Sequence, residues 1–126
     1  MTFGPVAIDA KDGLVYMGSQ DGHVYQWDLA SRKLLSKSAP LSGYVMTISV
    51  LDTSGWVAYA SQPGVIHLWN PKTGSNRVVQ SARASSNIVF DQHRGLAAFG
   101  TESGTIEFWD LPQERLVETK AFSNSR

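Results

Sequence analysis

Three stretches of the chain share one pattern of apolar and polar positions. Each opens on a glycine, runs through almost wholly apolar residues, turns at a polar triplet ending in glycine, and closes on tryptophan followed by aspartate or asparagine. They are residues 13–28 (GLVYMGSQDGHVYQWD), 55–70 (GWVAYASQPGVIHLWN) and 95–110 (GLAAFGTESGTIEFWD), which superpose without gaps. An internal repeat of about 40 residues decides the fold before local propensity does.

Each copy predicts two strands joined by a tight turn, because the polar triplets separate apolar runs. The third residue of each triplet supplies the positive φ that a tight hairpin turn needs, and these residues are Gly22, Gly64 and Gly104. The run before each turn is apolar almost throughout, which indicates a strand covered on both faces. These runs are residues 14–19, 56–61 and 96–101.

Further strand-like segments flank each hairpin. Those before it are residues 5–9, 44–50 and 87–91, and those after it are residues 33–38, 76–81 and 115–120. No segment shows a sustained helical period. The pattern therefore predicts an all-β protein with four strands per copy and twelve in all.

Repeats of this length that close on Trp-Asp resemble those of the WD40 family of β-propellers. The closing dipeptides are Trp27-Asp28, the variant Trp69-Asn70, and Trp109-Asp110. The resemblance implies a single propeller unit over residues 1–126, made of three four-stranded antiparallel blades over about 1–40, 41–82 and 83–126. The family's Gly-His pair is missing and its turn aspartate remains only as Asp21, so these blades are expected to depend on packing.

Two other resemblances keep alternatives open. Residues 14–22 (LVYMGSQDG) are also similar to the repeat of pyrroloquinoline quinone enzymes and their non-enzymatic relatives, which are propellers too. Residues 100–110 are similar to a string in nucleolar WD40 proteins of ribosome assembly. A quinoprotein-like enzyme and a ligand-binding, lectin-like propeller are the alternatives to a scaffold.

Closure of the ring is the physical problem that this sequence poses. Propellers need about four to eight blades so that each sheet has a neighbour on both faces. Three blades leave one apolar face uncovered at each end, and each face equals or exceeds the largest apolar patch of a typical soluble monomer, about 300 to 600 Å². We expect half of a six-bladed ring or a fragment of a larger propeller, completed by a second copy, another chain, or a longer protein.

Net charge, hydropathy and cysteine content exclude several classes of partner and site. Eleven basic and 11 acidic residues give a net charge of zero and a pI near 6.8, so nucleic acid is not expected as a direct ligand. No window approaches 18 apolar residues and no signal peptide is apparent, so no membrane contact and a cytoplasmic or nuclear location are expected. The absence of cysteine excludes disulfides, thiolate metal sites and a cysteine nucleophile.

The remaining polar residues predict no catalytic, cofactor or metal site. The histidines His23, His67 and His93 occupy non-equivalent places in the repeat, so repeat geometry would not bring them together. Asp9 and Asp91 stand four residues before a leading glycine, where aspartate commonly accepts backbone hydrogen bonds. No Gly-x-Ser-x-Gly or glycine-rich phosphate loop occurs.

The expected function is a non-catalytic scaffold that binds protein partners. The three repeat tryptophans are expected to anchor the core. Trp56 replaces a leucine at its strand start and is a candidate partner contact or a filler between blades. Tyr44 and Arg83 precede first strands, where WD40 proteins commonly bind partners, and are further candidates.

Overall fold

Strands and tight turns alternate along the chain in the computed structural model, which describes residues 3–41, 43–52, 54–61, 65–80, 88–111 and 113–121. None of these residues lies in a helix. The strands form three four-stranded antiparallel sheets, each in simple sequential order. Blade 1 contains β1 (Phe3–Asp9), β2 (Leu14–Ser19), β3 (Val24–Asp28) and β4 (Leu34–Lys37).

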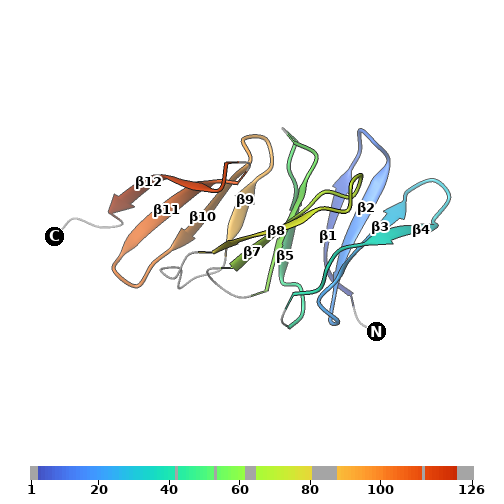
Figure 1. The fold of residues 1–126 in the computed structure, drawn as a ribbon, viewed down its shortest axis with the longest axis horizontal. Helices are drawn as coiled ribbons and strands as arrows, with labels where there is room; N and C mark the ends of the chain where they lie inside the picture. Colours follow the sequence, from blue (N-terminus) through green and yellow to red (C-terminus); the bar gives the residue numbers. More distant parts are fainter. Residues whose placement is uncertain are drawn as a thin grey trace.

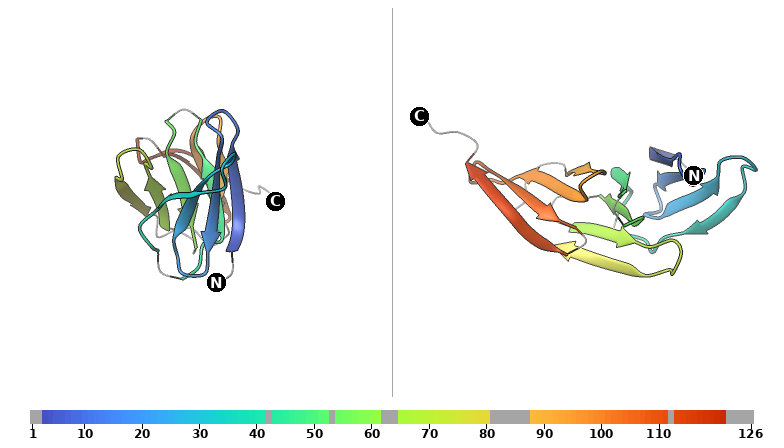
Figure 2. Two further views of the ribbon diagram at one scale, coloured as in Figure 1. Left: turned by 90° about the vertical axis from the view of Figure 1, so that its right-hand side faces the viewer. Right: turned by 90° about the horizontal axis from the view of Figure 1, so that it is seen from above.

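Blade 2 contains β5 (Thr47–Val50), β6 (Val57–Ala60), β7 (Val65–Trp69) and β8 (Asn76–Gln80), and blade 3 contains β9 (Val89–Asp91), β10 (Leu96–Gly100), β11 (Thr105–Asp110) and β12 (Arg115–Ala121). The three blades stand side by side, with blade 1 and blade 3 at opposite ends (Figure 1). Seen from above they form an open arc, with β1, β5 and β9 on its inner side and β4, β8 and β12 on its outer side (Figure 2). The all-β prediction and its three-bladed arrangement are confirmed.

Two apolar clusters fill the junctions between blades. The blade 1–2 junction buries Tyr16 and Val24 of blade 1 against Val57, Tyr59 and Trp69 of blade 2. Each of these five side chains is at most 2% exposed, so the junction is packed like a protein interior. The blade 2–3 junction is a separate cluster of Leu51, Ala58, Ala60, Ile66, Leu68, Val79, Ile88, Ala97, Phe99 and Leu111.

The hairpin turns have the backbone that their glycines predict. Gly22 has φ +89° and Gly104 has φ +84°, a region that side chains with a Cβ rarely adopt. Gly64, the third of this set, lies outside the described residues. The blade interiors also follow the prediction in part, since all four residues of β6 are buried, whereas β2 and β10 contain half-buried positions.

The start of β5 differs most from the prediction. The pattern predicts a strand over 44–50, but β5 starts at Thr47. The cause is Val45, which donates its amide to Ser19 O at 3.1 Å and packs its side chain into the blade 1–2 junction. Pairing with blade 2 starts only at Met46, whose amide bonds Ala60 O at 2.9 Å. The connection between the blades is therefore pinned to blade 1.

Candidate functional site

Each blade presents two faces that alternate along its strands. The forward face is directed toward the next blade and the rear face toward the preceding blade. In blade 2 the forward face carries Ala58 and Ile66, and the rear face carries Val57, Tyr59 and Trp69. Strand pairing and the repeat place equivalent residues on the same faces of blades 1 and 3. The candidate functional site is made of the two faces that have no neighbour among the described blades.

The rear face of blade 1 is an apolar groove of about 320 Å³. Its lining includes Val15, Met17, Trp27, Leu29 and Arg32. Leu29 is 38% exposed, whereas the equivalent Leu111 of blade 3 is fully buried against blade 2. The contrast shows what a neighbouring blade covers at this position.

The inner strand of blade 1 extends the same apolar face. Val6 and Ile8 pair in register with Met17 and Val15, so their side chains share the rear face. Val6 is 55% exposed and Ile8 is 57% exposed. Large apolar side chains gathered on one face mark an interaction site more often than scattered ones do.

The forward face of blade 3 is open in the same way. Leu96, Ala98, Ile106 and Phe108 are half-buried, while their counterparts in blade 2 are packed into the blade 2–3 junction. Val89 of β9 pairs with Ala98 and is 62% exposed. The two ends of the arc therefore present opposite halves of one type of junction.

A buried donor on the rear face of blade 1 lacks an acceptor. Trp27 Nε1 is buried and has no hydrogen-bond partner among the described residues. In blade 3 the equivalent Trp109 Nε1 donates to Glu107 Oε1 at 2.9 Å. An unmade hydrogen bond at a buried donor costs about 1 to 3 kcal/mol. Trp27 is half-buried, whereas Trp69 at the equivalent place in blade 2 is 2% exposed.

Charged side chains bridge the blade 2–3 junction near its rims. Arg77 of β8 forms an ion pair with Glu114 of the β11–β12 turn, and its guanidinium lies 5.6 Å from the Trp56 ring centroid. Asp52 and His93 pair at 2.6 Å. Neither Glu107 nor the Arg77–Glu114 pair was identified from the sequence. Glu107 contacts Trp109 within β11, and the Arg77–Glu114 pair joins two blades.

Trp56, one of the predicted partner contacts, lies in this junction. It is half-buried, packs against the apolar cluster and is covered by Arg77. Tyr44, the second, is 58% exposed in the connection before β5. Arg83 lies outside the described residues. The described structure does not bring the candidates together into one site.

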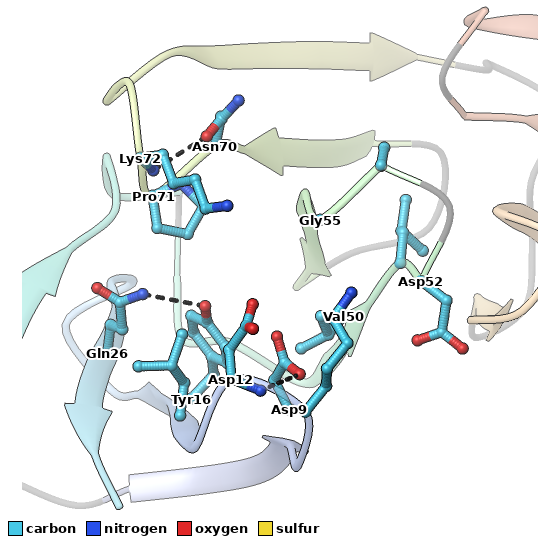
Figure 3. Close-up of a pocket in the computed structure, with 14 residues that line it drawn as sticks. Asp9, Asp12, Tyr16, Gln26, Val50, Asp52, Gly55, Asn70, Pro71 and Lys72 are labelled. Atoms are coloured by element: carbon cyan, nitrogen blue, oxygen red, sulfur yellow. Dashed lines mark hydrogen bonds between the residues drawn. The ribbon is translucent and has the colours of Figure 1, made fainter.

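A cleft of about 580 Å³ opens between blades 1 and 2 (Figure 3). Its floor includes Tyr16 and Gln26, which are joined by a 3.0 Å hydrogen bond from Gln26 Nε2 to the Tyr16 hydroxyl. The carboxylates Asp9, Asp12 and Asp52 lie around it. Lys11, Lys72 and Ser54 also line the cleft, so it offers hydrogen-bonding and charged groups.

The histidines have three separate environments. His23 Nδ1 lies 2.6 Å from Ser38 O, His67 stacks near Tyr59 with centroids 5.2 Å apart, and His93 pairs with Asp52. Burial lowers the pKa of His67. Within the described ranges, no group of three or more metal-ligating side chains could hold an ion.

The predicted turn aspartates do accept backbone hydrogen bonds. Asp9 Oδ1 accepts from the Asp12 amide at 3.2 Å, and Asp91 Oδ1 accepts from the His93 and Arg94 amides at 3.0 and 3.1 Å. Asp21 organises the blade 1 turn, with hydrogen bonds from the Ser19 hydroxyl, the His23 amide and, at 2.5 Å, the Tyr25 hydroxyl. These carboxylates stabilise turns.

Protonation of Asp21 should weaken blade 1 at low pH. Burial of the carboxyl raises its pKa, but the hydrogen bonds from Ser19, Tyr25 and the His23 amide together lower the pKa to about 2. Since this is below the ordinary value of 3.8, the carboxylate stabilises the fold above about pH 4, and this contribution is lost as the pH falls toward 2. We expect Asp21→Asn to lower the melting temperature by about 3 to 6 °C at pH 7.

The same substitution should have a smaller effect at pH 2, where the native carboxyl is itself protonated in about half of the molecules. Thermal melts followed by circular dichroism at both pH values measure this difference. Glu102→Gln, in the corresponding turn of blade 3, is the control. An equal loss of melting temperature by Asp21→Asn at pH 7 and pH 2 would contradict the role assigned to this carboxylate.

None of the described residues forms a helix that could span a bilayer. Comparison with protein-family models finds no match. Among curated proteins, the chain is 25% identical over 122 residues to THO complex subunit 6 of Arabidopsis thaliana, covering 90% of this chain and 32% of the relative. It is 26% identical over 113 residues to autophagy-related protein 16 of the same plant, covering 84% of this chain and 22% of the relative.

Among solved structures, the crystal structure of the RRP9 WD40 repeats superposes with a TM-score of 0.77. The match covers 95% of this chain and 38% of that one, at 13% sequence identity, so it shows the fold alone. The chain spans less than two fifths of the length of each of these proteins. The three sheets and this superposition together show that the chain has the fold of a partial WD40 β-propeller.

Proposed function

We propose that this chain is a non-catalytic protein-interaction scaffold whose two open faces pack against further β-propeller blades. One observation carries the proposal. The rear face of blade 1 and the forward face of blade 3 correspond, position by position, to the two sides of the packed junctions inside the chain. A further blade would therefore find a surface of the kind that blades already use here.

The energetics point in the same direction. Covering apolar surface contributes about 25 cal/mol per Å². The exposed side chains of Val6, Ile8 and Val89 are large and lie on the two open faces. Burial of these side chains favours an occupied over a solvent-exposed face.

The comparisons support a scaffold over the alternatives. One relative is, by its name, a subunit of a complex, and a protein of that kind assembles with other proteins. No observation on the described residues favours a quinoprotein-like enzyme or a lectin-like propeller. The absence of direct nucleic-acid and membrane contacts and a cytoplasmic or nuclear location stay predictions, as do the blade boundaries near residues 40 and 82.

Site-specific photo-cross-linking tests the proposal. A photoreactive amino acid at Val6 or Val89 samples the two open faces, and one at Val78, which is 48% exposed on the doubly covered blade 2, is the matched control. We expect Val6 and Val89 to cross-link more efficiently than Val78 in cells that make the protein. Mass spectrometry should identify the attached peptides as segments of β-propeller blades, from this chain or another.

Cross-linking at Val6 and Val89 that does not exceed cross-linking at Val78 would contradict this function. Adducts only with proteins that contain no propeller would contradict it as well. We also propose Tyr44 and Arg83 as partner contacts, and Trp56 as a partner contact or a filler between blades. Exposure of the Tyr44 side chain supports this assignment, whereas the packing of Trp56 beneath Arg77 favours a role between blades.

A further inference from the structure

Polar side chains at the edge of each blade junction, here called its rim, indicate which kind of blade can pack on the open faces. At the blade 2–3 junction the rim is the Arg77–Glu114 ion pair. Arg77 pairs in register with Leu68 and so belongs to the forward face of blade 2. Glu114 belongs to the β11–β12 turn of blade 3 and has φ +55°. One forward-face residue thus meets one turn residue of the next blade.

The positions equivalent to Arg77 on the forward face and to Glu114 in the turn can also be identified at the blade 1–2 junction. In blade 1 the residue that pairs with Gln26, as Arg77 pairs with Leu68, is Ser36. The turn residue of blade 2 is Gly74, which has φ +82° and precedes β8 as Glu114 precedes β12. The blade 1–2 junction therefore combines two uncharged residues, and the blade 2–3 junction combines a cation with an anion.

The open ends of the arc carry charges of opposite sign at these places. On the forward face of blade 3 the residue is Glu118, which pairs in register with Phe108. In the β3–β4 turn of blade 1 it is Arg32, which has φ +65° and lines the open groove beside Trp27. The two open ends therefore carry complementary charges. Compared with the Arg77–Glu114 pair the signs are exchanged, because the anion is on the forward face and the cation is in the turn.

Both charges are available for a new contact. The side chain of Glu118 is 49% exposed and lies 3.4 Å from Lys120, and an exposed ion pair of this kind contributes little. Arg32 is exposed, and one of its guanidinium nitrogens donates to the Leu29 carbonyl. A guanidinium has five N–H donors, so it can keep that bond and also donate to a carboxylate.

We propose that the occupant of both open faces is a second copy of this chain. Blade 3 of each copy packs its forward face on the rear face of blade 1 of the other, with Glu118 of one copy against Arg32 of the other. A twofold axis then relates two identical junctions, and six blades close the ring. This inference rests on the proposed function and names the partner for it.

Charge complementarity is what favours a second copy over other blades. A foreign set of blades would have to present an anion at one end and a cation at the other, at the two places defined by the repeat. This chain presents both the anion and the cation. They lie on two apolar faces that correspond to the two sides of its internal blade junctions. Complementary charges at an interface rim select partners and register more than they add affinity.

Sedimentation equilibrium of the full chain at low ionic strength tests the proposal. The wild-type protein should sediment at twice its chain mass of 13.8 kDa. Arg32→Glu places two acidic side chains at each junction and Glu118→Arg places two basic ones, so each variant should raise the dissociation constant by about ten-fold or more. Lys72→Glu and Glu102→Arg, with the same charge changes away from both faces, should leave the dissociation constant unchanged.

Mixing the two variants gives the sharper result. A heterodimer of the Arg32→Glu chain and the Glu118→Arg chain has an opposite-charge pair at both junctions, whereas each homodimer has none. An equimolar mixture should therefore return to within about three-fold of the wild-type dissociation constant. Circular dichroism of each variant alone confirms that it is folded, and the mixture excludes misfolding as the cause.

A wild-type chain that stays monomeric at 100 µM would overturn the second copy as occupant, and so would a mixture that associates no better than its components. Dimerisation of either single variant with wild-type affinity would overturn it as well. These outcomes leave the proposed function standing if Val6 and Val89 still cross-link to blades of another protein. Loss of those cross-links too would remove both proposals.

Discussion

Gly22→Ala should lower the free energy of unfolding by about 3 kcal/mol or more. Two separate costs add at this position. Gly22 has φ +89°, where a residue with a Cβ is strained. An added Cβ would also lie 2.5 Å from the Leu41 carbonyl oxygen and 2.8 Å from that of Gly43. These are backbone atoms, so they cannot move aside as a flexible side chain would.

The third repeat offers a matched control for this prediction. Gly104 occupies the same turn position in blade 3 with φ +84°, but an added Cβ there meets no atom within 4 Å. Gly104→Ala should therefore cost only the conformational part, about 1 kcal/mol. Chemical denaturation of both variants measures the difference. Equal losses would show that the segment containing Leu41 and Gly43 does not dock on the Gly22 turn.

Gly18→Leu should cost about 3 kcal/mol or more through overpacking between blades. A Cβ at Gly18 would lie 2.5 Å from Val45 Cγ1 and 2.6 Å from Val45 Cβ, and 3.3 Å from Pro5 Cγ. Val45 is 2% exposed within the blade 1–2 junction, so it has little room to move. A double-mutant cycle identifies the clash, because Val45→Gly should reduce the cost of Gly18→Ala by about 1 kcal/mol or more.

Gly100 is the equivalent glycine of blade 3 and provides the comparison. The sequence predicts a cost of about 1 to 3 kcal/mol for leucine at either position. The structure predicts different costs for the two substitutions, because Gly100 is half-buried on the forward face that no described blade covers. Gly100→Leu should therefore destabilise the folded chain less than Gly18→Leu. Chemical denaturation that ranks them in the opposite order would show that the covered and open faces are wrongly assigned.

Sequence periodicity predicted the strands well because the alternation of faces and turns is local. Residues 14–19 form β2 as predicted, and the turn glycines Gly22 and Gly104 have the required positive φ. The largest difference is at the start of β5, whereas β4, β6 and β9 begin one or two residues later than predicted. Val45 packs beside Gly18 and donates its amide to Ser19 O of blade 1, so β5 begins only at Thr47.

The candidate site was predictable in kind but not in its residues. Counting three repeats against the blades that a ring needs predicts two open apolar faces, whichever residues line them. Identification of Glu118 requires register, because a β-bulge shifts β12 relative to β8, whereas the turn residues Arg32 and Glu114 align directly with Gly74. The simple alignment of the repeats places Val117 opposite Arg77, whereas strand pairing places Glu118 there.

The sequence by itself determined the repeat, the four strands of each blade and the tight turns, and it predicted an open apolar face at each end. These depend on interactions over a few residues and on a count of blades. Only the tertiary structure decided which side chains a neighbouring blade covers and which remain exposed on the open faces. The equivalent residues Leu111 and Leu29 illustrate this, because Leu111 is 0% exposed and Leu29 is 38% exposed. The physical reason is that burial and charge pairing belong to the junction between two sheets, whose residues lie far apart along the chain.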